Sequence, residues 1–251
     1  MMARSFSCPM QERIEAAGRY LAAAPGETGL VLRDRVTGAT WRNANARRAF
    51  AAASTVKLAM VADLLLREES GVIRLTPADR SLIDAALRES SDAAADRLWS
   101  AFEDAAFLTR IQAFGMSGAS FTASPAYWGF MTCSAGDLSN LMDYVLDRLP
   151  ASGRDEIIDD LQHVSPAQQW GVWGAGPSNQ PGNKNGWVST NGIWTVTTAG
   201  FAGPHARYTL AIMNQLGGEA GFQTGANTLT QVAALLFLGH QIPAPDVSAT
   251  P

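Results

Sequence analysis

The sequence predicts an α+β fold, in which an antiparallel sheet is flanked by an N-terminal and a C-terminal helix and stands beside an all-helical lobe. Strand patterns occur at both ends of the chain, and the long middle of the chain is mainly helical in pattern. Because two strands alone are not stable, the strands from both ends are expected to share one sheet. A functional site is then expected between the two lobes, where pockets commonly form.

A chain of 251 residues with 47% hydrophobic content is long enough to bury a large core. We therefore expect one domain over residues 1–251. Its α/β lobe is expected to comprise residues 1–53 and 166–251, and its helical lobe residues 54–165.

The N-terminal third predicts helix, strand, strand and helix in that order. Residues 11–24 have the spacing of an amphipathic helix, and residues 29–34 and 39–43 indicate two strands joined by a turn. Residues 54–67 predict a helix that is apolar almost all round. Such a helix belongs inside a core rather than on a surface.

The middle part of the chain is predicted to be mainly helical, and the C-terminal part is predicted to contain three strands and a last helix. Further helices are predicted at 77–87, 92–102, 104–114, 134–149, 154–162 and 221–238. Three strands in series are predicted at 183–190, 193–201 and 206–215. Two long segments, 115–131 and 166–183, are expected to be loops, and loops of this length in a compact domain are usually functional.

Composition excludes several classes of partner. A net charge of −4 argues against a nucleic acid or an anionic membrane, and no apolar run approaches the length of a transmembrane span. The cysteines and histidines lack metal-ligand spacing, so we expect neither metal nor cofactor. Residues 1–8 contain no apolar signal-peptide region. The expected location is therefore cytoplasmic, or secreted if a leader is missing, and the oligomeric state stays open.

The lysines are the first residues to consider for chemistry. The chain has 19 Lys plus Arg, and only Lys57 and Lys184 are lysines. Codon bias toward Arg explains part of this count. Lysine nevertheless differs from arginine in one useful way, because a buried lysine can lose its proton and act as a base.

The first motif is Ser54-Thr55-Val56-Lys57 at the start of the apolar helix. Residues three apart share a helix face, so the hydroxyl and the amine can meet. Free N–H groups at a helix start favour a developing oxyanion. The ordinary alternative is an N-cap serine and a surface lysine. Lys57 lies between Val56 and Leu58, however, and burial there would lower its pKa.

Two further motifs follow in order along the chain. Ser90-Ser91-Asp92 stands between two predicted helices, and Lys184-Asn185-Gly186 stands on a predicted strand. Taken alone, the first is an ordinary helix N-cap and the second an ordinary turn signal.

Together the three motifs resemble the S-x-x-K, S-D-N and K-T-G triplet of penicillin-binding proteins and class A β-lactamases. The order of elements is similar over nearly the whole chain, and the likeness is strongest to small serine hydrolases of actinobacterial type. The resemblance implies that Ser54 attacks an acyl carbonyl, that Lys57 takes its proton and that Ser90 relays a proton to the leaving group. It further implies that Lys184 holds a substrate carboxylate. A one-residue shift would make Ser91 the motif serine instead of Ser90.

The resemblance also implies the remaining substrate-binding and oxyanion positions, which are Asp92, Asn185, Gly186 and Trp187. Three departures from the family pattern are evident. Asp92 puts a carboxylate where the family has an amide, and Asn185 replaces a hydroxyl residue. No glutamate lies between Asp104 and Asp155, the interval in which class A enzymes carry the residue that activates water for deacylation.

We therefore expect a serine hydrolase or acyltransferase that forms a Ser54 acyl-enzyme on a small amide, ester or β-lactam substrate. β-Lactamase activity is expected to be weak. The alternative is a degenerate member of the same fold that binds a ligand without turning it over, and a coincidental triplet is a third hypothesis.

Overall fold

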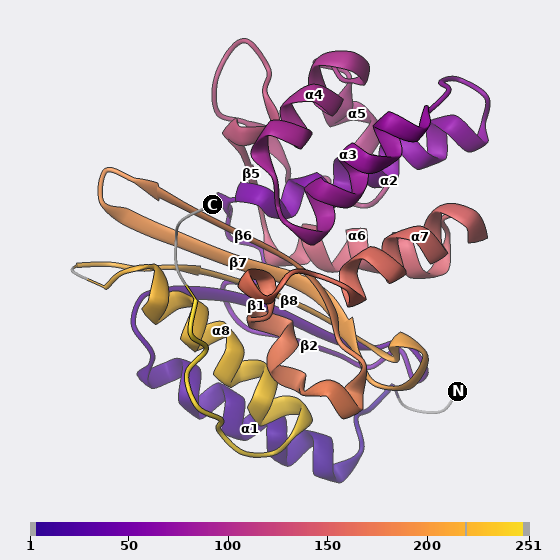
Figure 1. The fold of residues 1–251 in the computed structure, drawn as a ribbon. Helices are drawn as coiled ribbons and strands as arrows, with labels where there is room; N and C mark the ends of the chain where they lie inside the picture. The colour runs from indigo at the N-terminus through magenta and orange to yellow at the C-terminus, as the bar shows by residue number, and fades with distance from the viewer. Residues whose placement is uncertain (1–3, 219, 248–251) are drawn as a thin grey trace.

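The structure of the chain is a computed structural model that describes residues 4–218 and 220–247. A five-stranded antiparallel sheet separates two groups of helices. The first and last helices, α1 and α8, cover one face, and the helices α2 to α7 stand on the other side (Figure 1). The predicted α+β fold class, with a helical lobe beside the sheet, is confirmed.

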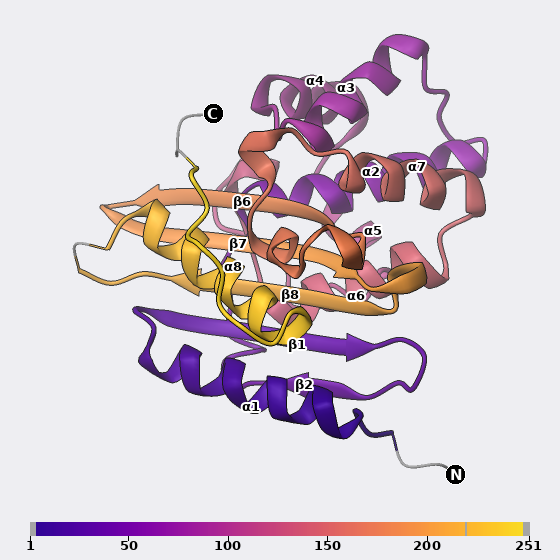
Figure 2. The same ribbon diagram turned by 60° about the horizontal axis from the view of Figure 1, so that its bottom comes forward.

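The strand order of the sheet is β2-β1-β8-β7-β6, so the two N-terminal strands join the three C-terminal strands at the pair of β1 and β8. β1 pairs with β8 along its whole length, from Glu27 opposite Gln215 to Asp34 opposite Tyr208. The bounds of the strands are β1 Glu27–Asp34, β2 Thr40–Arg42, β6 Gly182–Thr190, β7 Ile193–Ala202 and β8 Tyr208–Gln215. β6 forms the edge that faces the helices (Figure 2).

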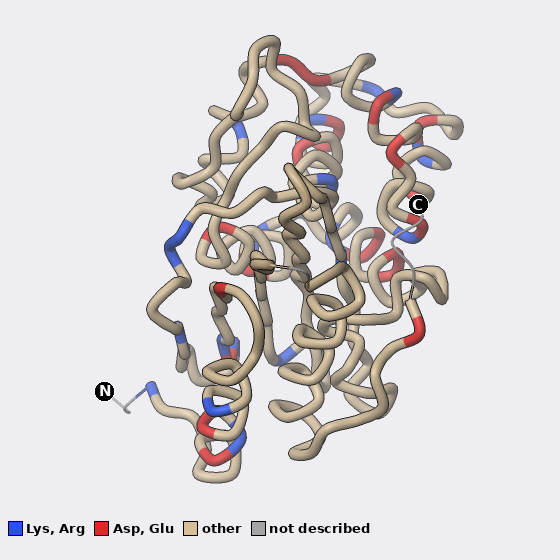
Figure 3. The backbone as a smooth tube through the Cα atoms, turned by 90° about the vertical axis from the view of Figure 1, so that its left-hand side faces the viewer, with Lys and Arg blue, Asp and Glu red and all other residues tan. Residues whose placement is uncertain are grey.

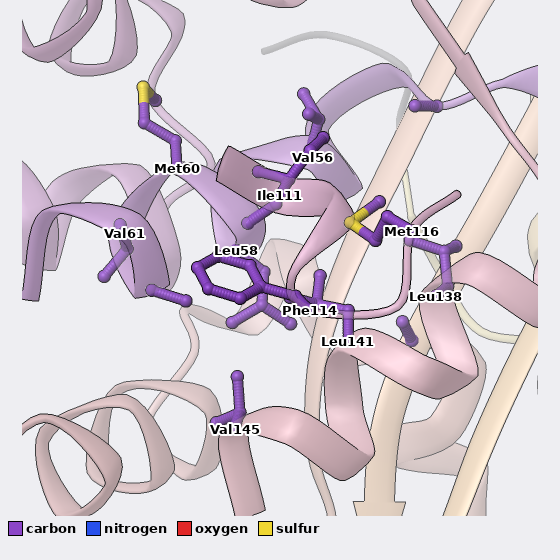
Figure 4. Close-up of a cluster of buried hydrophobic side chains, with 14 of the residues drawn as sticks. Val56, Leu58, Met60, Val61, Ile111, Phe114, Met116, Leu138, Leu141 and Val145 are labelled. Carbon is purple, nitrogen blue, oxygen red and sulfur yellow. The ribbon is translucent and has the colours of Figure 1, made fainter. Parts of the chain in front are cut away.

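The helices pack around α2, which is buried on nearly every side, as its apolar sequence predicts. Figure 4 shows Leu58 of α2 among side chains of the neighbouring segments, with Phe114 and Leu141 beside it. Burying one such side chain contributes about 1.5–3 kcal/mol. The bounds are α1 Cys8–Ala23, α2 Val56–Glu69, α3 Pro77–Arg88, α4 Asp92–Phe102, α5 Phe107–Gln112, α6 Ala135–Asp147, α7 Ala151–Gln162 and α8 Phe222–Phe237.

Several predicted helices have different ends in the structure, and α1 and α5 show two physical reasons. α1 begins at Cys8 instead of residue 11, because Pro9 is accommodated in the first helical turn. α5 is only six residues long, although residues 104–114 were expected to be helical. Asp104 accepts a hydrogen bond from the backbone N–H of Ala106 at 2.9 Å, and this local turn competes with the helix.

The two expected loops contain more structure than the sequence indicates. Residues 120–133 supply two strands of a small sheet with order β3-β5-β4, whose strands are Phe50–Ala51, Met131–Cys133 and Ser120–Phe121. Residues 166–179 form three short 3₁₀ turns around the buried Trp170. The small sheet matters for the site, because β3 ends two residues before the turn that carries Ser54.

Charges of both signs are interspersed on the surface. Figure 3 shows acidic and basic residues side by side along α1, and α8 has no charged residue. Within residues 4–218 and 220–247, no helix is long and apolar enough to cross a membrane. In the same ranges, no group of three or more His, Cys, Asp or Glu side chains is arranged to hold a metal ion.

One group of charges is buried between α2, α4 and α5. Glu103 is fully buried and pairs with Arg110 and Arg67, which also pair with Asp63. Burial, together with the charge of Asp63, raises the pKa of Glu103 to about 8. Its Oε1 atom has no hydrogen-bond partner among the described residues, which fits a carboxyl group that keeps its proton near neutral pH.

This raised pKa predicts that stability falls as the pH rises through about 8, because the folded chain holds a proton that the unfolded chain has already lost. The free energy of unfolding in urea should therefore decrease more between pH 6 and pH 9 for the wild type than for Glu103→Gln. Equal pH slopes in the two proteins would contradict the assignment.

Candidate active site

Ser54 lies in a tight turn at the start of the buried helix. The 3₁₀ turn Ala53–Thr55 leads directly into α2, so the helix proper begins at Val56 instead of Ser54. Ala53 has a φ of 47°, a left-handed conformation that side chains other than glycine rarely adopt. Ser54 is half-buried, and its neighbours Ala53 and Thr55 are buried. The turn therefore presents Ser54 at the surface of an otherwise closed segment.

The edge strand β6 passes directly against this turn at Gly186. A Cβ atom on Gly186 would lie 2.7 Å from the backbone nitrogen of Ser54 and 2.9 Å from that of Thr55. Both neighbours are backbone atoms and cannot move aside without shifting the turn. The glycine of the third motif is therefore required for the close approach of the strand to the serine turn.

Lys57 is fully buried, and its amine is surrounded by electron-rich groups. The Nζ atom donates to the backbone carbonyl oxygen of Ser90 and to the Oδ1 atom of Asp92, each at 2.6 Å. It also lies 4.8 Å from the centroid of the Trp128 ring. Burial lowers the pKa of Lys57, whereas the hydrogen bond and the charge of Asp92 raise it. Burial is the larger effect, as the apolar neighbours predict.

Lys184 is also fully buried, and it meets the second motif. Its Nζ atom donates to the Oγ atom of Ser90 at 2.8 Å and to the carbonyl oxygen of Asn185 at 2.9 Å. Burial and the charge of Lys57 hold the pKa of Lys184 well below its ordinary value. Ser90 thus links the two lysines, through its carbonyl oxygen to Lys57 and through its hydroxyl to Lys184.

The side chains of the two serines in the second motif make different hydrogen bonds. Ser90 points its hydroxyl at Lys184 and has a φ of 61°. Ser91 is the N-cap of α4, where its Oγ atom accepts from the backbone N–H of Ala94 at 3.2 Å. This division favours Ser90 over Ser91 as the motif serine.

Asn185 and Trp187 point their side chains away from Lys184, because successive residues of a strand face opposite sides. The Asn185 amide donates to the carbonyl oxygens of Gln168 and Trp170 at 2.8 and 3.3 Å. The Trp187 ring packs beside Trp170 and Phe222. The Asn185 side chain is therefore committed to the 3₁₀ turns behind the strand, which argues against its predicted contact with substrate. The group of Trp187 that is predicted to donate to the oxyanion is its backbone N–H, and the position of its ring does not affect that prediction.

Three residues around Lys57 were not singled out from the sequence as parts of a site. Asp96 lies one helical turn after Asp92 on α4, and its Oδ1 atom accepts from the Tyr127 hydroxyl at 2.6 Å and from the Trp128 indole nitrogen at 2.9 Å. These bonds hold the 3₁₀ turn at 128–130 over the lysine. The sequence signal for Asp96 was its four-residue spacing from Asp92, which places both carboxylates on one face of a helix.

A groove of about 780 Å³ lies beside the serine turn. It is bounded by β3, by the turn at 128–130 and by the hairpin of β6 and β7, and Ala51 and Val188 are among the residues that line it. Ala51 is three residues before Ser54, and Val188 is two residues beyond Gly186. The groove therefore offers space next to Ser54, the predicted nucleophile, for part of a substrate.

Comparison with known proteins agrees with this arrangement. The sequence model of a family described as the beta-lactamase enzyme family matches residues 9–79. A protein named "Putative lipoprotein LppW" from Mycobacterium tuberculosis (strain ATCC 25618 / H37Rv) is 31% identical over 233 residues, which cover 88% of this chain and 73% of that protein. The chain belongs to the superfamily of serine β-lactamases and penicillin-binding proteins.

Solved structures show the same fold at lower identity. A β-lactamase from Xanthomonas campestris pv. campestris str. ATCC 33913 has a TM-score of 0.75 and 20% identity, and the match covers 91% of this chain and 97% of that chain. A representative class A β-lactamase from Bacteroides cellulosilyticus DSM 14838 has a TM-score of 0.76 and 13% identity, with coverage of 92% and 98%. These matches confirm the predicted fold, and the family model together with the 31% identical relative confirms the predicted family resemblance.

The contact at Gly186 gives a direct test of the site geometry. Gly186→Ala should reduce acylation of Ser54 by about 100- to 1000-fold, the loss expected when one oxyanion donor is misplaced, because the added methyl group displaces the Ser54 amide. The rate should be measured with a fluorescent penicillin. Gly217→Ala is the control, since a Cβ atom there meets no neighbour within 4 Å and the residue does not have a left-handed φ. Wild-type acylation by Gly186→Ala would refute this role for the glycine.

Proposed function

We propose that the chain is a serine hydrolase or acyltransferase that acts through a Ser54 acyl-enzyme on an amide, ester or β-lactam carbonyl. The observation that supports this most strongly is the placement of Ser90 between the two lysines. Its carbonyl oxygen lies 2.6 Å from Lys57 and its hydroxyl 2.8 Å from Lys184. Three motifs that are far apart in the sequence therefore meet in one buried hydrogen-bonded group.

In the proposed acylation step, the Oγ atom of Ser54 attacks the carbonyl carbon and its proton passes to neutral Lys57. Burial favours that neutral state. The backbone N–H groups of Ser54 and Trp187 are the proposed donors to the oxyanion. As the tetrahedral intermediate collapses, the leaving group takes a proton through the Ser90 hydroxyl. The product of this step is an ester between the acyl group and Ser54.

Lys184 is proposed to act through Ser90. The side chain of Lys184 is fully buried, and its amine already donates to the Ser90 hydroxyl. A direct contact with a substrate carboxylate, as the family resemblance implies, would require a path past Ser90. Its influence on the substrate is therefore proposed to be through the orientation and acidity of that hydroxyl.

Deacylation is proposed to be slow. No glutamate lies between Asp104 and Asp155. The two carboxylates beside Lys57 each have one oxygen atom engaged, since Asp92 accepts from Lys57 and Asp96 accepts from Tyr127 and Trp128. Within this group of described residues, a carboxylate dedicated to activating water is therefore missing.

The ion pair of Lys57 and Asp92 supports a second candidate, which is a binding protein that does not turn its ligand over. A lysine that keeps its proton on account of Asp92 is not a base. In that case an acyl compound would bind beside Ser54 without forming an ester with it.

The relative's name also bears on location. That protein is named as a lipoprotein. This supports secretion or membrane anchoring as the proposed location for the present chain, in preference to the cytoplasmic expectation.

Labelling separates the two candidates. A fluorescent penicillin should attach covalently to Ser54 alone, and peptide mapping should find no label on Ser54→Ala. The label should then be released slowly, so that a chromogenic cephalosporin gives a burst of one equivalent followed by weak turnover. Reversible binding without a covalent label would support the binding protein, and a label on Ser90 or Ser91 would overturn the assignment of the nucleophile.

The two lysines can be separated by substitution with arginine, which stays charged. Lys57→Arg should keep the fold, because Asp92 can accept from a guanidinium, yet lose about 100- to 10,000-fold in acylation rate for want of a base. Lys184→Arg should lower the Tm more, since that site is fully buried and no carboxylate pairs with Lys184 among the described residues. Substantial acylation by Lys57→Arg would show that Lys57 is not the base.

A further inference from the structure

We propose that Asp92 makes the site selective for acyl donors that carry an ammonium or another strong hydrogen-bond donor next to the scissile carbonyl. This inference rests on the proposed function of Ser54 and deepens it by naming a class of substrate. It is carried by the position of the Asp92 carboxylate, by its exposure and by the charges around it.

Asp92 is the solvent-exposed partner of an ion pair whose other member, Lys57, is buried. The side chain of Lys57 is fully buried, whereas that of Asp92 is 63% exposed. Its Oδ1 atom is taken by Lys57 at 2.6 Å, and the structure gives its Oδ2 atom no hydrogen bond among the described residues. An ionised carboxylate accepts hydrogen bonds and donates none. A substrate group that reaches Asp92 must therefore be a donor.

The geometry brings that carboxylate close to the reacting carbonyl. Ser54 and Lys57 are three residues apart at the start of α2, and so share one face of it. Asp92 is in direct contact with Lys57. An acyl carbon attacked by Ser54 lies about 3–3.5 Å from its Oγ atom. Substituents one or two bonds beyond that carbon are then in the neighbourhood of Lys57 and Asp92.

The charges around the pair favour a cation further. Asp96, one turn along α4, is a second carboxylate that acts on Lys57, and its partners Tyr127 and Trp128 are neutral donors. Lys184 has no carboxylate partner among the described residues, and burial lowers its pKa well below the ordinary value. When Lys57 is neutral, as the proposed acylation step requires, the two carboxylates outnumber any positive charge on Lys184, and the four groups carry at least one net negative charge. An anionic substituent would be repelled there.

The test uses three p-nitrophenyl esters that differ in one substituent on the carbon next to the scissile carbonyl. The ester of phenylalanine has an amine there, the ester of 3-phenylpropanoic acid has hydrogen and the half-ester of benzylmalonic acid has a carboxylate. The second-order rate of Ser54 acylation is measured for each at pH 6.5, where an α-amino group is protonated, and is divided by the rate of spontaneous hydrolysis of the same ester. On this scale the wild type should react about five-fold faster with the phenylalanine ester than with the phenylpropanoate ester, as one screened charge contact predicts, and slowest with the benzylmalonate half-ester.

Two variants test whether Asp92 is the cause of this order of acylation rates. Asp92→Asn keeps an acceptor for Lys57 and supplies an amide donor, so the rate ratio of the phenylalanine ester to the phenylpropanoate ester should fall to about one and the benzylmalonate half-ester should react faster than with the wild type. Glu15→Gln changes the net charge equally but on α1, where the glutamate pairs with Arg19 on the opposite face of the sheet, and it should keep the wild-type order.

The outcomes separate this inference from the function on which it rests. Failure of every ester and of the fluorescent penicillin to acylate Ser54 overturns the proposed function and the inference with it. Acylation of Ser54 at rates that do not depend on the substituent, or that are highest for the benzylmalonate half-ester, overturns the inference alone. Retention of the wild-type order in Asp92→Asn overturns it as well. Because the three wild-type rates already test the order, the result does not depend on the folding of the variant.

Discussion

The contacts of the Lys57 amine are the constraint on which the rest of the site depends. Removing an ammonium from water carries a penalty of several kcal/mol, and only well-placed acceptors offset it. Those acceptors come from other segments: the carbonyl oxygen of Ser90, the carboxylate of Asp92 and the ring of Trp128. The lysine therefore ties α2 to the start of α4 and to the loop before β5. If any of these contacts were lost, a buried charge would be left without compensation.

The second lysine extends this constraint to the sheet. Lys184 stands on the edge strand and reaches Ser90, whose φ of 61° is itself an uncommon conformation for a residue with a side chain. The strain at Ser90 is of the order of 1–3 kcal/mol, and it persists because the contacts around Ser90 hold this conformation in place. One strained residue thus presents a carbonyl oxygen to one lysine and a hydroxyl to the other, and Ala53 is strained in a similar way beside Ser54.

The sequence predicted much of this arrangement because its signals were periodic or ordered. The apolar surroundings of Lys57 predicted its burial, and the strand patterns at the two ends predicted a shared sheet. The sequence could not predict that Trp128 covers Lys57, because that contact is made by a loop without periodicity. The strands of the small sheet are only two or three residues long, too short for an alternating pattern. The side chain of Asn185 was assigned to the substrate because the motif is linear, whereas the strand points it the other way.

The closeness of the strand and the serine turn explains why the chemistry and the fold cannot be separated here. Gly186 leaves no room for a methyl group between β6 and the backbone of Ser54. The same strand carries Lys184 two residues earlier, so any shift of β6 that relieved a clash at position 186 would also move the lysine away from Ser90. The small sheet opposes such a shift from the other side, because the amide of Ala52 donates to the carbonyl oxygen of Met131 at 2.9 Å. The turn that holds Ser54 is therefore fixed by backbone contacts on both flanks. An exposed side chain such as Asp92 can therefore be replaced without shifting the turn that holds Ser54, which is what the proposed role of Asp92 in substrate preference requires.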